Sequence, residues 1–206
     1  MSSPIDPSPR YLPADERRVV TVEAVVSLAA EQNPGDITTA AIAKRMGLTQ
    51  GAIFRHFPSK DSIVQAVIEW VTERLMSRVD KAAQSQASPL QALEAVFVAH
   101  IGFIAEHPGA PRMLLAELQK AGDSVPKRMV TALIGGYRER LAWLLERGKE
   151  AGEVDPQLDV ESATTLYVGM IQGLVMQSLS AGEPKRLLRD APKAFAIFRK
   201  GIARSA

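Results

Sequence analysis

Apolar residues recur at intervals of three and four along nearly the whole 206-residue chain, and this spacing limits the fold more than any other feature. The longest run, Ile63, Val67, Val71, Leu75 and Val79, places its side chains on one face of a helix. We find no alternating run of β-branched residues bounded by hairpin turns, which is the pattern typical of strands. The sequence therefore predicts an all-α fold of about nine helices.

Glycine, proline and capping threonine residues set the boundaries of these helices. A first helix starts near Asp15 and ends at 33–35, where Asn, Pro and Gly follow one another. Thr38 or Thr39 caps a short second helix that Gly47 ends, and Thr49 caps a short third helix. A longer fourth helix follows at about 60–79. The remaining helices are expected at about 88–107, 110–118, 124–151, 159–181 and 190–203.

Bulk composition limits the chemistry. The net charge is only +2, with a sequence pI near 9.0, so a nucleic-acid partner would have to bind through a local basic patch. The absence of cysteine excludes disulfides, thiolate nucleophiles and Cys-ligated zinc. The Ser/Pro-rich stretch 1–14 lacks the apolar core of a signal peptide, so we expect a disordered arm and a cytoplasmic protein.

One uncharged segment is long enough to cross a bilayer, from Ser162 to Gly182. Polar residues interrupt it, among them Thr164, Gln172 and Gln177, and each would be costly against lipid. A helix buried against protein is the better interpretation, and we expect no membrane partner.

The stretch 37–61, ITTAAIAKRMGLTQGAIFRHFPSKD, has the organisation of a helix-turn-helix. Gly47 allows positive φ between two short helices, and Ala43 and Ile53 supply the small and branched contacts that pack one helix on the other. This packing leaves the opposite face free for DNA.

On that face, small or amide-bearing residues come first and cations follow. Thr49 and Gln50 are placed to reach base edges, and Gly51 and Ala52 leave room for close approach to DNA. Basic residues farther along suit the phosphate backbone, which makes binding dependent on salt. The candidate DNA-binding residues are Thr38, Thr39, Lys44, Thr49, Gln50, Gly51, Ala52, Phe54, Arg55, His56 and Lys60.

Several of these residues have a second interpretation. His56 either contacts a phosphate or makes a structural hydrogen bond beside Phe57, and the two threonines at 38 and 39 either cap a helix only or also contact a phosphate. Arg10 either enters the minor groove or belongs to a disordered arm. Outside such a motif, Arg55, His56 and Lys60 would indicate only a solvated charged face.

The same stretch resembles the DNA-binding signature of the TetR family of bacterial transcriptional regulators. The matching positions are Thr39, Ile42-Ala43, Gly47-Leu48-Thr49, Gly51, Ile53-Phe54, His56-Phe57 and Lys60-Asp61. One position departs from the pattern: the family usually has tyrosine where this chain has Phe54, so one phosphate hydrogen bond is missing.

The resemblance implies a homodimer on a pseudo-palindromic double-stranded operator. It implies a DNA-binding domain at 15–75, with its motif at 38–57, and a ligand-binding and dimerisation domain at 76–206. The last two helices would form a dimer bundle. The candidate interface residues are Gly169, Gly173, Phe195 and Phe198, although the two glycines also fit packing within one chain.

The resemblance also implies a pocket for a small apolar or aromatic effector that releases repression. The candidate pocket residues are His100, Phe103, His107, Met113, Tyr137, Trp143, Tyr167, Met170 and Gln172. His100 and His107 lie seven residues apart, but no third ligand follows at matching spacing. We therefore expect pocket residues there, with no metal and no cofactor.

The sequence suggests three candidate functions. A ligand-responsive repressor in the cytoplasm, associated with the nucleoid, is the main hypothesis. The alternative is a TetR-like DNA-binding protein without an inducer that recruits a protein partner, as regulators of cell division with a similar RHFPSK stretch do. A helical enzyme has little support because the sequence has no P-loop, dinucleotide-binding, HExxH or nucleophile-elbow motif, so we predict that the protein is not an enzyme.

Overall fold

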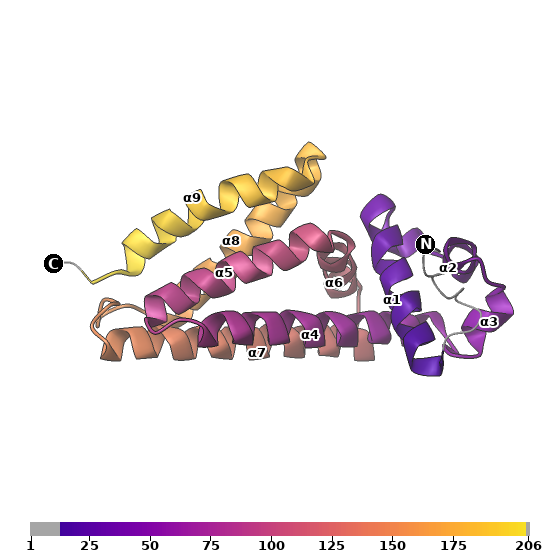
Figure 1. Cartoon of the computed structure of the whole chain (residues 1–206), viewed down its shortest axis with the longest axis horizontal. Coiled ribbons are helices and arrows are strands. Elements are labelled where there is room, and N and C mark those ends of the chain that lie inside the picture. The colour runs from indigo at the N-terminus through magenta and orange to yellow at the C-terminus, as the bar shows by residue number, and fades with distance from the viewer. Residues whose placement is uncertain (1–12, 205–206) are drawn as a thin grey trace, which may run out of the picture. The chain divides into compact units, whose positions relative to one another are not determined.

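The computed structural model describes residues 13–204, and this part of the chain is all-α, as the sequence predicts (Figure 1). Its nine α-helices and one 3₁₀ turn are α1 (Ala14–Glu31), η2 (Pro34–Asp36), α2 (Thr39–Met46), α3 (Gln50–Phe54), α4 (Lys60–Gln84), α5 (Pro89–Glu106), α6 (Gly109–Gln119), α7 (Val125–Glu150), α8 (Val160–Ala181) and α9 (Pro184–Ile202). Within this range the only β pairing is a single bridge between Val154 and Ala203. The expected arm, including Arg10, lies outside the described residues except for its last two positions.

Helix α9 starts earlier than the sequence predicts. A start at 190 was expected because Pro192 reads as a boundary, but Pro192 lies inside the helix and the expected start is wrong. Proline removes one backbone hydrogen bond from a helix interior, which costs stability but does not end a helix that packing holds. Leu187, Ala191 and Phe195 are all buried at this point, and they keep one face of α9 against the core.

By packing, the chain divides into two compact units. Unit 1 contains the chain up to Val71 together with His107–Val130, and unit 2 contains Thr72–Glu106 and the chain from Thr131 onwards. Helix α6 thus belongs to the same unit as α1 and the η2 turn, which it contacts, although it lies far from them in sequence. A functional boundary near residue 75 stays a prediction.

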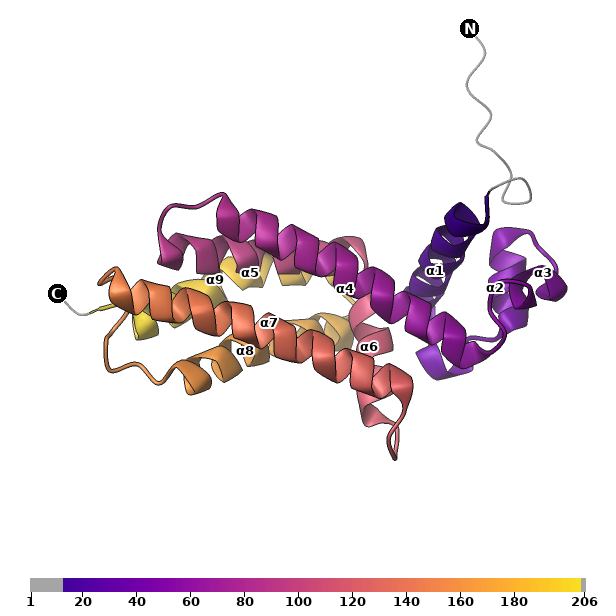
Figure 2. The same cartoon turned by 90° about the horizontal axis from the view of Figure 1, so that it is seen from below.

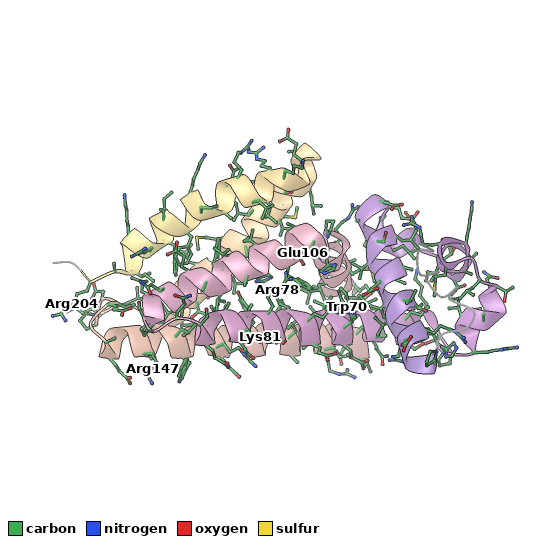
Figure 3. The ribbon with its side chains drawn as sticks, in the orientation of Figure 1. Trp70, Arg78, Lys81, Glu106, Arg147 and Arg204 are labelled. Carbon is green, nitrogen blue, oxygen red and sulfur yellow. The ribbon has the colours of Figure 1, made fainter. Side chains whose placement is uncertain are left out.

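Unit 1 is built on a close contact between α1 and α6. A Cβ atom at Gly109 would lie 1.9 Å from the carbonyl oxygen of Val26, so only glycine fits there. Nearby, Arg112 donates from Nη1 to the carbonyl oxygen of Ala30 at 3.0 Å, which occupies an acceptor in the last turn of α1. Trp70 of α4, labelled in Figure 3, meets His107 edge to face with ring centroids 4.9 Å apart.

Unit 2 has an aromatic core. Helix α9 lies along α5 and α8 in both views (Figures 1 and 2), and all three helices contribute to this core. Tyr167 is fully buried, its hydroxyl donates to the carbonyl oxygen of Leu93 at 2.9 Å, and its ring lies 5.4 Å from that of Phe97. Burial with a satisfied hydroxyl is what a core tyrosine requires.

Helix α5 is long and apolar enough, by length and composition alone, to cross a membrane. A core helix of a soluble protein passes the same test, and 44% of α5 is buried within the structure. Leu93, Phe97 and Ile101 face the core of unit 2. On its surface, Glu106 of α5 accepts from Arg78 of α4 at 2.8 Å (Figure 3).

Candidate nucleic-acid interface

Hydroxyl caps and one glycine form the helix-turn-helix. Thr38 caps α2 by accepting from the backbone N–H of Ala41 at 3.1 Å, and Thr49 caps α3 by accepting from Ala52 at 3.3 Å. Between them Gly47 has φ of 65°, in the left-handed region that favours glycine. Each cap satisfies a backbone donor that a helix start otherwise leaves unpaired.

An ion pair fastens the motif to α1. Arg45 of α2 donates to Glu31 at 3.0 Å and to Ser27 at 2.8 Å, and its hydrogen bond to the Glu31 carboxylate lowers the pKa of that group. No local sequence pattern connects residues so far apart, so the sequence alone does not predict these contacts of Arg45. The guanidinium of Arg45 is therefore paired within the chain. Its neighbour Lys44, by contrast, is exposed and has no ion pair within residues 13–204.

His56 takes part in the packing of the motif. Its Nε2 lies 3.0 Å from Nη1 of Arg17, and because a guanidinium only donates, Nε2 accepts. Beneath it Phe57 is fully buried, and the guanidinium of Arg18 lies 5.2 Å from the centre of the Phe57 ring. This arrangement favours the structural role of His56 over direct phosphate contact.

The start of α3 presents a polar, exposed face. Thr49, Gln50, Gly51 and Arg55 are exposed, and Gln50 Nε2 lies 3.4 Å from the hydroxyl of Thr39, a long contact that leaves the amide available. The ring of Phe54 is 49% exposed, although phenylalanine side chains are usually buried. Ile53, by contrast, is buried and packs α3 into unit 1.

Gly51 has no role in the packing of unit 1. A Cβ atom built there meets no described atom within 4 Å, and no positive φ is recorded at this position. The fold therefore does not require glycine at residue 51. Close approach of DNA at this residue stays a prediction.

Lys60 has a fixed position at the start of α4. Its Nζ donates to the carbonyl oxygen of Gly35 at 2.9 Å, which ties α4 to the η2 turn. Ser59 and Ser62 cap the same helix reciprocally, each backbone N–H donating to the other hydroxyl at 3.1 Å. The ammonium group is exposed and has donors left for a phosphate.

Comparisons with known proteins agree with this geometry. The family model for bacterial regulatory proteins of the tetR family matches residues 22–67. A nucleoid occlusion factor from Aliivibrio fischeri is 31% identical over 147 residues, which cover 71% of this chain and 74% of that protein. One from Vibrio cholerae is 32% identical over 133 residues, covering 60% of this chain and 68% of that protein. The chain belongs to the TetR family.

Solved structures extend the similarity to the whole fold. The ketosteroid transcriptional regulator of Mycobacterium tuberculosis aligns with a TM-score of 0.76 at 22% identity, over 92% of this chain and 96% of that one. The transcriptional regulator FadR of Bacillus subtilis, solved in complex with stearoyl-CoA, aligns with a TM-score of 0.78 at 21% identity, over 89% of this chain and 98% of that one. As a TetR-family member, the protein binds DNA through its helix-turn-helix and is not an enzyme.

The structure distributes the candidate pocket residues over several environments. Phe103, Tyr137 and Tyr167 are buried in unit 2, whereas Met113 and His107 belong to unit 1. Trp143 is 59% exposed, Gln172 is exposed and Met170 is half-buried. A hollow of about 180 Å³ in unit 2 is lined by two of the candidates, Tyr137 and Trp143.

The two histidines considered for metal binding have other partners. His100 Nδ1 lies 3.0 Å from the hydroxyl of Tyr137, and burial lowers the pKa of His100 to about 4. His107 meets the ring of Trp70 edge to face. In the described part of the chain, no three acidic or histidine side chains come together as a metal site.

The candidate dimer residues fall into two groups. Cβ atoms built at Gly169 and Gly173 meet no described atom within 4 Å, so packing within the chain does not explain these glycines. Phe195 and Phe198, by contrast, are only 2% and 3% exposed, because they lie in the aromatic core of unit 2 and not on the surface. Exposed apolar residues of α8 and α9 replace them as candidates: Leu166, Met176, Leu188 and Ile197.

Proposed function

We propose that this TetR-family protein works as a DNA-bound homodimer that recruits a protein partner, in the manner of regulators of cell division, and does not depend on release by a small inducer. The observation that carries this proposal is the similarity to nucleoid occlusion factors along most of the chain. A third such protein, from Marinomonas, is 27% identical over 163 residues, 78% of this chain and 82% of its own length. The proposed location is the cytoplasm, on the nucleoid.

The structure of unit 2 supports the same proposal. The residues expected to surround an effector are divided between core, surface and the other unit. The hollow of about 180 Å³ is smaller than the roughly 300–1,000 Å³ of pockets for drug-sized ligands. Its lining includes the ion pair between Asp80 and Arg140, at 2.7 Å, which ties α4 to α7.

The proposed DNA contacts come from the exposed face of α3 and from the cations beside it. Gln50 and Thr49 would read base edges, Gly51 would allow the backbone of α3 to come near, and Arg55, Lys60 and Lys44 would contact phosphates. Two copies would place two such faces on adjacent major grooves, through a bundle of α8 and α9.

A ligand-responsive repressor is the second candidate. The observation that favours it is the hydrogen-bonded pair of His100 and Tyr137 in an otherwise apolar core, with Tyr137 reaching the hollow. A few convergent polar groups in an apolar cavity are typical of small-molecule sites.

The deciding experiment combines site mapping and cell imaging in the host organism. Bound sites are mapped across the genome for the wild type and for a Gln50→Ala, Arg55→Ala double variant. Cell length is then measured when each protein is overproduced. We expect many dispersed sites, and elongated cells with the wild type only. A single site beside the protein's own gene, normal cell length and release of the DNA by a metabolite would instead establish the repressor.

A further inference from the structure

Unit 1 contains a cavity of about 400 Å³, close to the DNA-binding face and apart from the expected effector pocket. Helices α1, α4 and α6 and the η2 turn line it, and it opens to solvent on one side. Of the expected pocket residues only Met113 lines it. The volume falls within the range of pockets that hold small molecules.

The walls of this cavity are mainly apolar. Ile37, Ile63, Val64 and Met113 line it, and each is at least nine-tenths buried in the chain. Such a surface suits an apolar group whose transfer from water is favourable.

The polar side of the cavity is a buried carboxylate. Glu117 of α6 is only 3% exposed, and Lys120 donates to its Oε1 at 2.5 Å. Its Oε2 has no hydrogen-bond partner in the described part of the chain. Buried carboxylate oxygens are normally paired, so an unmatched one calls for a donor that the chain does not supply.

The charged residues around the cavity favour a cation as that donor. Lys60 already directs its ammonium to the carbonyl oxygen of Gly35, and Lys120 is engaged by Glu117. Asp61, the second carboxylate of the lining, has no ion pair within residues 13–204. The carboxylates of Glu117 and Asp61 therefore have acceptor capacity left, and a cationic donor is the ligand group that matches them.

We propose that this cavity binds a primary ammonium ion that carries an apolar group about the size of an indole. The ammonium donates to Glu117, whose carboxylate turns readily about its last side-chain bond, and the apolar group packs on Ile63, Val64 and Met113. The site shares Lys60 with the proposed DNA contacts, but the residues that would hold the amine are not among those contacts, and the proposal does not depend on how the DNA-bound protein acts.

Calorimetric titration of the full chain, without DNA, tests the proposal. The probes are hexylamine, phenethylamine and tryptamine, each paired with the alcohol that replaces its ammonium by a hydroxyl. We expect saturable binding of one amine per chain, and at least tenfold weaker binding of the matching alcohol. Binding should not change in Arg55→Ala, which removes a proposed phosphate contact.

Three variants locate the site. Glu117→Gln keeps the shape and removes the charge, and should weaken amine binding at least tenfold. Ala116→Phe fills the cavity while the carboxylate stays, and should abolish binding even if the first variant proves unstable. Glu146→Gln, on the exposed surface of α7, is the matched control and should bind as the wild type does. Folding of each variant is checked by circular dichroism.

Three results would overturn the proposal: no saturable binding of any of the three amines, equal binding of an amine and its alcohol, or unchanged binding in a folded Ala116→Phe variant.

Discussion

At the scale of single residues, Gly51→Ala would add one methyl group to the surface of α3. Chain packing leaves open space at its Cβ position, and glycine within a helix costs up to about 1 kcal/mol relative to alanine. We expect Gly51→Ala to raise the urea midpoint slightly and to weaken operator binding about tenfold, roughly 1.4 kcal/mol, because the methyl group would lie between α3 and DNA. Fluorescence anisotropy measures the affinity.

The control is Gly102→Ala on α5, where the added Cβ also meets no described atom within 4 Å. This variant should keep or slightly raise the urea midpoint, as Gly51→Ala should, and leave the affinity for DNA unchanged. If Gly51→Ala bound the operator as well as the wild type, close approach of DNA at this position would be ruled out.

Arg55 and Gln50 should differ in how their loss affects binding. Arg55→Ala removes a proposed phosphate contact, so affinity for operator and scrambled duplex should fall together, and the log–log salt slope should decrease by about 1. Gln50→Ala removes a proposed base contact, so about 1–3 kcal/mol of discrimination should be lost while the salt slope stays. The reverse pattern would exchange the two proposed roles.

His100 links protonation to the stability of the aromatic core. Its pKa is 6.5 in an unfolded chain and about 4 in the fold, where burial disfavours the imidazolium. As the pH falls below 6.5 the unfolded chain binds a proton before the folded chain does. Stability should therefore be highest above pH 6.5 and fall by up to about 3 kcal/mol by pH 4.

The measurement is urea unfolding between pH 7.5 and 4, for the wild type and for His100→Gln. The variant should lose this part of the pH dependence. An identical pH dependence in the two proteins would mean that the fold does not hold this imidazole neutral.

At the scale of elements, the sequence predicts a helix end correctly where the residues at that end form the cap themselves. Thr38, Gly47 and Thr49 form the expected caps and turn, because each bonds within a few positions of itself. The start of α9 was missed because tertiary packing holds Pro192 inside the helix. The contact of α6 with α1 had no local signal, since Gly109 and Val26 are far apart in sequence.

That contact gives a prediction for the α1–α6 pair. Gly109→Ala would place a methyl group 1.9 Å from the carbonyl oxygen of Val26, so the helices must separate. We expect a loss of about 2 kcal/mol or more in the free energy of unfolding, measured in urea. Gly135→Ala on α7, where a Cβ meets no described atom within 4 Å, should be neutral or stabilising. A tolerated Gly109→Ala would show that the two helices have room to move apart.

At the scale of the whole molecule, the helix-turn-helix was predictable because one short stretch contains its two helices, their caps and the turn between them. Phe195 and Phe198 were placed in the dimer interface because periodicity shows that a face is apolar but not what covers it. The cavity around Glu117 was not foreseen, since four segments distant in sequence form it.

Dimerisation is best tested at the most exposed apolar side chain of α9. Ile197 is 75% exposed, and Ile197→Glu would place a charge in the proposed α8–α9 bundle. We expect a shift from dimer to monomer in sedimentation velocity and at least tenfold weaker operator binding. Val98→Glu, at an exposed position of α5, should leave both unchanged. A dimeric Ile197→Glu protein would move the interface away from this face.

The pair of Arg45 and Glu31 affects how salt titrations of this protein are interpreted. Both side chains are partly exposed, so dissolved ions weaken their attraction, and the pair helps to hold α2 on α1. Rising salt would therefore loosen the helix-turn-helix while it competes for phosphates. The number of phosphates contacted, when it is calculated from the salt slope, then also includes ions taken up by the protein. An Arg45→Met, Glu31→Met double variant lacks this pair and should give a smaller number, which counts the phosphates alone.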